Sequence, residues 1–271
     1  MQKKFTYMTI FFLVCTLHIP LQSMKKIIKL GGSVITQKSA HVGMAKEQAI
    51  DNVAQQIALY KSPLVLTHGT GSFGHPLYHA YNLENEFDLE GTVKVHKAEK
   101  QLNNIVMHSL HKHGIKAICI DPFYHIVCQD GRITHMPIDF IKELIIQGFI
   151  PVLFGTMVYD TKRKAYGLSS DQITTYLAEH LDIDQAGFAS CEHGVYDKSG
   201  DIIPEINPVN FQDLKTCIGG SEHIDVTGGM LGKVEEAIEA QGLSSCIFNG
   251  EQQESISQFL YDEPIGTQIL S

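Results

Sequence analysis

The chain has 271 residues, of which 44% are hydrophobic and 19% charged, so it can bury a full core as one large α/β domain or as two closely joined lobes. Its 21 Lys and Arg against 30 Asp and Glu give a formal charge of −9, which excludes an overall field that attracts nucleic acid or an anionic membrane surface. Any anionic ligand must therefore be held by local positive groups.

The N-terminal segment, residues 1–23, differs in character from the rest of the chain. An apolar run at residues 8–19 follows Lys3 and Lys4, which resembles a secretory signal. The run is short for a stable membrane insertion, and Leu21 does not fit the small-x-small pattern of a cleavage site. The alternative is an upstream start codon wrongly chosen. We favour a cytoplasmic protein that starts near Met24, because the ATP inferred below is not supplied outside the cell.

Apolar periodicity divides residues 24–271 into alternating strands and helices. The first half is expected to hold strands at 27–30, 64–66 and 117–120, helices at 45–60 and 91–113, and a hairpin at 126–133 that turns at Asp130-Gly131. The pattern continues with a helix from Pro137 to near Gly148, a strand at 150–154, a polar turn at 160–164, a helix at 169–181 and a strand near 185–189.

The last third begins with an irregular polar stretch that runs through Pro208. It is followed by a helix from Gly228 or Gly229 to Ala240, with Thr227 as its cap and Gly242 as its stop. Strands at 246–248 and 267–270 flank a final helix. Because strands alternate with helices over the whole length, we expect an α/β fold with a mainly parallel sheet covered on both faces.

Cysteine and histidine give little reason to expect a metal centre. The six cysteines form no C-x-x-C pair and mostly lie in or beside apolar stretches, which is typical of buried thiols in a reducing compartment. The 14 histidines show no H-E-x-x-H or similar spacing, so no protein metal ligand is predicted. We expect His108, His111 and His113, on a polar helical stretch, to need only solvent.

Two glycine-rich turns carry the strongest chemical signal. Lys29-Leu30-Gly31-Gly32-Ser33 follows the first strand, and His68-Gly69-Thr70-Gly71-Ser72-Phe73-Gly74-His75-Pro76 follows the second. Glycine lets the backbone approach a ligand closely, and the N-terminus of a following helix favours anions. Neither turn matches a P-loop or a dinucleotide fingerprint. A third run, Asp225-Val226-Thr227-Gly228-Gly229-Met230-Leu231-Gly232-Lys233, places a lysine one turn into a helix.

In this order, K-x-G-G-S, H-G-x-G-S-F-G-H-P and D-V-T-G-G-M-x-x-K resemble the isopentenyl phosphate kinases of the amino acid kinase superfamily, and the resemblance covers residues 25–271. It implies a three-layer αβα sandwich, usually homodimeric, that moves the γ-phosphoryl group of ATP onto isopentenyl phosphate in isoprenoid biosynthesis. An N-terminal lobe to about residue 155 would bind the acceptor, and a C-terminal lobe would bind the nucleotide.

The chemistry requires cations rather than a base. An acceptor phosphate monoester has a second pKa of ~6 and is largely a dianion at neutral pH. Its attack on ATP is limited by the repulsion of two anions, which lysines and backbone N–H groups relieve. Mg²⁺ is expected to bridge the nucleotide phosphates with mostly water and phosphate ligands.

The resemblance and this chemistry together assign the site residues. Lys29, Lys38, His75 and Asp171 are the expected catalytic residues, with Lys38 neutralising the transferring group and Asp171 orienting the lysines. The expected nucleotide contacts come from Lys29, Gly31, Gly32, Ser33, Gly71, Gly229 and Lys233. The acceptor is expected to bind at Thr70, His75 and Gly155. Taken singly, Lys29 reads as an edge lysine, Lys233 as a surface lysine, and Asp171 as a helix cap.

Three departures from the family pattern stand out. Thr70 occupies a position where the family usually has glycine, so its side chain must fit beside the acceptor or turn away. Ser170 and Gln172 replace a glycine and an aspartate of the usual S-G-D-D pattern. Ser190-Cys191-Glu192-His193 replaces T-D-V-D, which leaves nucleotide affinity open. The alternatives are a related kinase for another small phosphate or phosphonate, or a regulatory module that binds ATP without turnover.

Overall fold

The computed structural model describes residues 26–37, 43–216, 218, 229–240 and 242–271. The N-terminal segment 1–23, the start near Met24, the catalytic prediction Lys38 and the helix cap Thr227 lie outside these residues.

The described strands are β1 (Lys26–Leu30), β2 (Leu64–His68), β3 (Ala117–Cys119), β4 (Val127–Gln129), β5 (Arg132–His135), β6 (Ile150–Phe154), β7 (Thr156–Asp160), β8 (Lys164–Leu168), β9 (Gln185–Ser190), β10 (Glu205–Ile206), β11 (Ser244–Asn249) and β12 (Thr267–Leu270). The described helices are α1 (Gly32–Ile35), α2 (Glu47–Leu59), α3 (Gly71–Ala80), α4 (Leu89–Lys112), α5 (Pro122–His125), α6 (Ile138–Ile146), α7 (Ser170–His180), α8 (Pro208–Leu214), α9 (Gly229–Glu239) and α10 (Ser255–Leu260).

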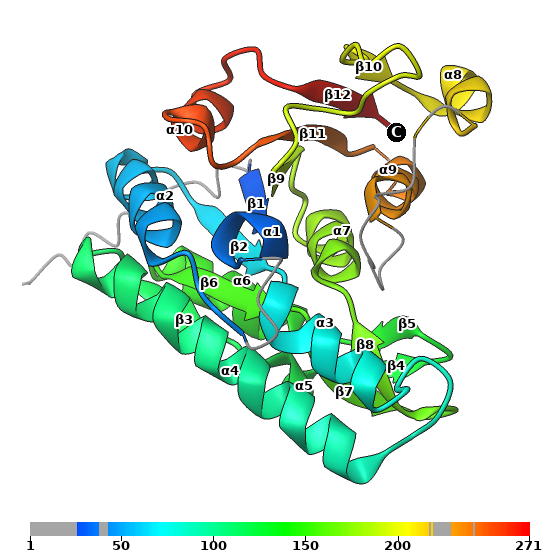
Figure 1. Cartoon of the computed structure of the whole chain (residues 1–271). Coiled ribbons are helices and arrows are strands. Elements are labelled where there is room, and N and C mark those ends of the chain that lie inside the picture. Colours follow the sequence, from blue (N-terminus) through cyan, green and yellow to red (C-terminus); the bar gives the residue numbers. More distant parts are fainter. Residues whose placement is uncertain (1–25, 38–42, 217, 219–228, 241) are drawn as a thin grey trace, which may run out of the picture.

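The predicted parallel sheet is confirmed and has eight strands in the order β10-β12-β11-β9-β1-β2-β6-β3. Its pairs are parallel except β11 with β12, which is antiparallel. The first described strand, β1, therefore lies near the centre of the sheet, between β2 and β9 (Figure 1).

Two helical layers cover the sheet, as expected for an αβα sandwich. Within β1, Ile28 packs with α2, α4 and α10, whereas Ile27 packs with α6, α7 and α9. This division follows from the two-residue period of a strand, which sends successive side chains to opposite faces. Since both faces are buried, the strands read as continuous apolar runs.

A second, four-stranded sheet in the order β5-β4-β7-β8 lies beside α3 and α4 (Figure 1). The predicted hairpin is confirmed, with Asp130 and Gly131 at φ 51° and 78°. The predicted polar turn at 160–164 joins β7 to β8, and Asp160 accepts hydrogen bonds from the backbone N–H groups of Asp130, Gly131, Lys162 and Arg163. This one carboxylate therefore ties the two hairpins together.

Two expectations are wrong. The stretch before Pro208 is not wholly irregular, since β10 pairs with β12 and Asn207 caps α8 through a capping box. His111 and His113 do not need only solvent: His111 bonds the carbonyl of Ala117 at 2.9 Å, and His113 bonds Asp51 at 3.0 Å. Local polarity predicted exposure, but the packing of α4 on β3 and α2 supplies partners.

The four described cysteines, Cys119, Cys128, Cys191 and Cys246, are free thiols. Cys128 and Cys246 are buried, and burial raises the pKa of each to about 12. Among the described helices none is both long and apolar enough to cross a membrane.

Candidate functional site

The predicted site residues follow strands whose carboxyl ends lie level in the sheet. Leu30, the last residue of β1, pairs with His68 of β2 and Ala189 of β9, and His68 pairs with Phe154 of β6. The turns that follow are joined by backbone hydrogen bonds, from Gly31 to Ala189, from Gly69 to Leu30 and from Gly155 to His68. Parallel pairing therefore brings three segments far apart in sequence to one edge, where open α/β sheets bind ligands.

The two glycine turns touch each other directly. A Cβ placed on Gly32 would lie 2.4 Å from the backbone nitrogen of Gly71, and one on Gly69 would lie 2.7 Å from the nitrogen of Gly32. Gly71 also has φ +48°, and its Cβ would lie 2.0 Å from Oγ1 of Thr36. These positions therefore require glycine for close backbone approach, independently of any ligand.

Polar side chains fix the first turn against the second. Thr36 donates to the carbonyl of Gly32 at 2.7 Å and accepts from the backbone N–H of Ser72 at 3.0 Å. Lys46 donates to the carbonyl of Ser33 at 2.8 Å and pairs with Glu251. The sequence analysis did not single out Thr36 or Lys46, because their roles depend on contacts between segments.

Lys29 and Asp171 form a buried ion pair at this edge. The ammonium of Lys29 lies 2.8 Å from Oδ1 of Asp171, and both side chains are less than a tenth exposed. The cap of α7 is Ser169, whose hydroxyl accepts from the backbone N–H of Gln172. Asp171 is therefore not the helix cap, and Lys29 is not an edge lysine.

Helix α3 carries His75, which is half-buried one turn inside the helix start at Gly71. Thr70 directly precedes the first residue of α3, and its side chain lies between two glycines. A Cβ on Gly74 would lie 2.6 Å from Oγ1 of Thr70, and a Cβ on Gly155 would lie 3.3 Å from Cγ2 of Thr70. The threonine therefore fits because its neighbours have no side chains. The predicted acceptor residues Thr70, His75 and Gly155 lie in two adjoining segments.

Gly229 and Lys233 lie in the first turns of α9, and the Lys233 ammonium donates to the carbonyl of Gly229 at 3.1 Å. Figure 1 shows α9 beside α7, whose N-terminal turn holds Asp171. Electrostatic coupling between Glu236 of α9 and Asp171 is consistent with this closeness. Lys233 thus belongs to the same side of the sheet as Lys29, whereas Lys38 is outside the described residues.

A buried His68–Asn103 contact lies under the second turn. The ring of His68 bonds the Asn103 side chain at 3.2 Å and stacks on Phe154, and burial lowers its pKa. Asn103 also donates to the thiol of Cys119. His68 is therefore a neutral structural residue that ties β2 to α4. In the sequence, the one feature that set His68 apart was its position as the first residue of the second glycine-rich turn.

The departures from the family pattern have local partners. Gln172 donates to the carbonyl of Gly131 at 3.2 Å, so it reaches the β4–β5 hairpin. Ser190 accepts from the backbone N–H of Glu192 at 3.0 Å, and Asn249 donates to the carbonyl of Cys191 at 3.3 Å. This turn after β9 is thus held by serine and asparagine in place of aspartates.

The residues present fit a nucleoside triphosphate. The two glycine turns start helices α1 and α3 at the carboxyl edge of the sheet, and the buried ammonium of Lys29 lies at the same edge. The described residues contain no group of three His, Cys, Asp or Glu side chains able to hold a metal ion. A Mg²⁺ ion that takes most of its ligands from phosphates and water is compatible with that donor set.

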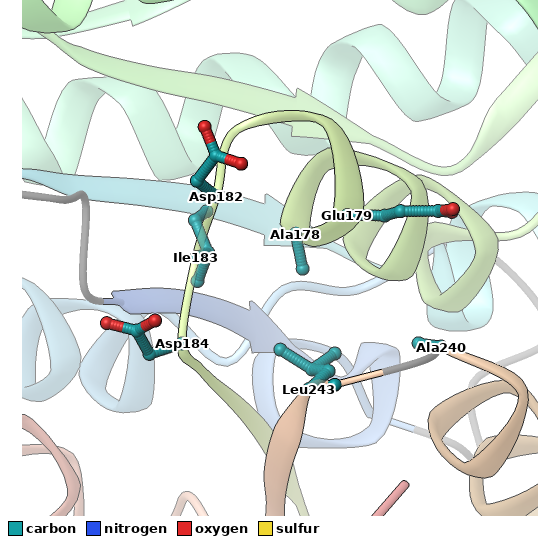
Figure 2. A pocket seen from close by; sticks show the side chains of 8 residues that line it. Ala178, Glu179, Asp182, Ile183, Asp184, Ala240 and Leu243 are labelled. Carbon is teal, nitrogen blue, oxygen red and sulfur yellow. The ribbon is translucent and has the colours of Figure 1, made fainter.

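A pocket of about 250 Å³ lies at the opposite edge of the sheet, before the first residues of β9 and β11. Figure 2 shows its wall of mixed apolar and acidic side chains, which contains none of the predicted site residues and consists of Ala178, Glu179, Asp182, Ile183, Asp184, Ala240, Gly242 and Leu243. Three carboxylates make it unsuited to a phosphate.

Known proteins show the same motifs and fold. The model of the amino acid kinase family matches residues 24–249. Isopentenyl phosphate kinase of Methanothermobacter thermautotrophicus is 32% identical and that of Haloferax volcanii 33% identical, each alignment covering 90% of this chain and 98% or 97% of the relative. A crystal structure of isopentenyl phosphate kinase superposes with a TM-score of 0.78 at 28% identity, over 90% of this chain and 99% of that one. This chain therefore belongs to the amino acid kinase family.

Proposed function

We propose that this chain transfers the γ-phosphoryl group of ATP to isopentenyl phosphate, forming isopentenyl diphosphate for isoprenoid biosynthesis. Members of its family use ATP, typically with Mg²⁺. The two archaeal relatives support the acceptor, because their alignments extend over nearly their whole length.

The observation that carries the proposal is the meeting of the two glycine turns beside the Lys29–Asp171 pair. ATP, when bound, supplies the phosphoryl group. Backbone N–H groups of Gly32, Ser33 and Gly71 would hold its phosphates, together with Lys29, Lys233 and the start of α9 at Gly229. Gly31, whose own N–H already donates to the carbonyl of Ala189 at 2.8 Å, would contribute to the close approach of the turn and not a donor. Asp171 keeps the ammonium of Lys29 in one place, and Lys38 would neutralise the transferring group.

On the acceptor side, His75 would hydrogen-bond the phosphate of isopentenyl phosphate, with Thr70 and Gly155 beside it. An imidazolium next to a dianion has its proton stabilised by that charge. The N-terminal turn of α3 adds its partial positive charge. Since the acceptor is already ionised, these groups relieve repulsion and align the two phosphates, and no general base is required.

We also propose that the part of the chain up to about residue 155 forms the acceptor lobe, that the remainder forms the nucleotide lobe, and that the protein is a homodimer. The contact between Gly155 and Ser170, where a Cβ on Gly155 would lie 3.2 Å from the Ser170 nitrogen, joins the two parts.

A second candidate is a kinase of another small phosphate or phosphonate. Thr70, which narrows the space beside Gly155, favours this alternative because it differs from the usual glycine. The phosphate machinery would be unchanged, and the tail contacts would differ.

One assay separates these functions. The full chain, and in parallel the chain from Met24 onward, is incubated with MgATP and isopentenyl phosphate, dimethylallyl phosphate or a short alkyl phosphonate, and ADP and the phosphorylated product are measured. We expect turnover of isopentenyl phosphate. Activity with the phosphonate alone would support the second candidate, and ATP binding without turnover of any acceptor would support a regulatory module.

A further inference from the structure

Helix α4 buries a carboxyl group that the proposed chemistry does not use. Glu99 is only 4% exposed. It follows the buried Val95 by four residues and precedes the buried Leu102 by three, so it lies on the apolar face of the helix. Among the described residues no ion pair is formed by Glu99. A glutamate at such a position requires a specific explanation.

The carboxyl group lies against both segments proposed to bind the acceptor. A Cβ on Gly74 would lie 2.6 Å from Oε1 of Glu99 and equally 2.6 Å from Oγ1 of Thr70. Gly74 directly precedes His75. From the other side, the hydroxyl of Thr156 and the backbone N–H of Met157 hydrogen-bond the carboxyl group. Glu99 therefore fills the space between the start of α3 and the start of β7.

At and next to this carboxyl group, α4 carries two buried polar atoms without a hydrogen-bond partner in the part of the chain that the structure describes. They are Oε2 of Glu99 and Nε2 of His96, one turn earlier, and the latter lies 3.9 Å from a carboxylate oxygen of Asp121. The other ring nitrogen of His96 bonds Oγ1 of Thr156 at 3.3 Å. Such atoms are rare in folded proteins, and the one on Glu99 calls for an explanation.

The charge state of Glu99 matters for a dianionic ligand. Burial raises its pKa to about 8, and the bonds from Thr156 and Met157 offset only part of that effect, so the side chain is mainly neutral at pH 7. A neutral acid can donate a hydrogen bond and adds no negative charge beside the acceptor phosphate. An ionised carboxylate in the same place would repel that phosphate.

We propose that Glu99 is a positioning residue of the acceptor site, which works as a neutral acid between Thr70–His75 and Gly155–Met157 and must keep its proton for the acceptor to bind. The inference rests on the proposed function in one respect, that the acceptor is a phosphate dianion held near His75. It adds a coupling between the protonation of the Glu99 carboxyl group and the affinity for the acceptor.

The elements packed around Glu99 carry further titratable and charged groups, and the Glu99→Gln variant separates the titration of Glu99 from theirs. They are His75 and Tyr78 on α3, His96 and Lys100 on α4, Asp121 before α5 and Asp160 at the end of β7. Burial raises the pKa of Tyr78 to about 12 and lowers that of His96, and hydrogen bonding to Asp121 raises that of Lys100. The Asp160 pKa is also lowered, by backbone hydrogen bonds that outweigh burial. The acceptor, with a second pKa of ~6, stays a dianion throughout this range.

The test compares kcat and KM for isopentenyl phosphate across that range in the wild type, Glu99→Gln and the matched control Glu90→Gln, an exposed glutamate on the same helix. With a pKa of about 8, acceptor KM should rise about fivefold between pH 8 and pH 9 in the wild type and in Glu90→Gln, with kcat and the KM for ATP nearly unchanged. Glu99→Gln should show a flat acceptor KM. A wild-type rise that persists in Glu99→Gln, or no rise in the wild type, would overturn the proposal.

A substrate-free measurement separates this inference from the proposed function. Infrared spectra of the wild-type protein should show the carbonyl stretch of a protonated carboxylic acid at pH 7 that disappears on titration through pH 8–9, and Glu99→Gln should lack it. If isopentenyl phosphate is not turned over but this band is present, the proposed acceptor is wrong, whereas the protonated state of Glu99 is supported. If the band is missing while isopentenyl phosphate is turned over, the role of Glu99 is wrong.

Discussion

Strand β1 buries a lysine near each of its ends, and the two ammonium groups are held in different ways. At the amino end, Lys26 donates to the carbonyls of Phe259 and Leu260 at 2.8 and 2.9 Å and pairs with the largely exposed Asp262. At the carboxyl end, Lys29 pairs with the buried Asp171. Since the two lysines are three residues apart, they also face opposite layers of the sandwich.

The difference separates a structural use of charge from a chemical one. Lys26 lies where the last carbonyls of α10 need a donor, so it acts as a cap for that helix. Lys29 lies at the strand edge where the glycine turns meet, and its partner keeps it charged in a buried place. Glu99 is accommodated in a third way: within the described part of the chain no cation pairs with its buried carboxyl group, and burial keeps this group mainly neutral.

Breaking the carboxyl-end pair should have the largest effect. We expect Lys29→Met to lower kcat by about 10²–10³-fold, as for the loss of one donor that stabilises transition-state charge. It should also destabilise the protein by about 3 kcal/mol, because Asp171 loses the ammonium that faces it. Steady-state kinetics and urea unfolding measure the two effects. The double variant Lys29→Met/Asp171→Asn should regain stability without regaining activity; recovery of both would refute a chemical role.

Removing the acceptor-side imidazole should have an intermediate effect. We expect His75→Ala to raise acceptor KM by about 10- to 100-fold, corresponding to the loss of one charge-assisted hydrogen bond, while ATP affinity by calorimetry stays within about twofold. His79→Ala is the matched control, since His79 lies one turn later on α3 and pairs with Glu84 at the surface. Equal losses in acceptor and ATP binding would count against the proposed place of His75.

Removing the amino-end lysine should have the smallest effect on activity. We expect Lys26→Met to lower the free energy of unfolding by about 2 kcal/mol, because buried carbonyls at the end of α10 lose their donor. At a temperature where the variant is folded, kcat should equal that of the wild type. A loss of kcat in the folded variant would show that the two ends of β1 do not divide structure from chemistry.

Much of the fold was predictable because it depends on local pattern. The apolar runs of β1 and β2, the long helix α4 and the Asp130-Gly131 turn each have the period or turn residues that their structure requires. The short β10 and the helix α8 were missed. A two-residue strand has no period, and the partner of β10, β12, lies at the end of the chain.

The candidate site was predictable only in part. The glycine turns could be located because close backbone approach demands glycine. The spacing of Glu99 from Val95 and Leu102 places it on the apolar face of the helix, which indicates burial. A charged side chain at such a position is nevertheless expected to be exposed, and only the packing of α4 shows that it is buried. Thr36 and Lys46 had no comparable signal.

By itself, the sequence determined the order of strands and helices, the turns where glycine is obligatory, and the supply of lysine and histidine next to them. Only the tertiary structure decided that Lys29 pairs with Asp171, that Thr70 fits between Gly74 and Gly155, and that Glu99 is shut away from water. The reason is that backbone geometry is set within a few residues of the chain. Charge state and ion pairing depend instead on desolvation and on neighbours that distant segments bring together.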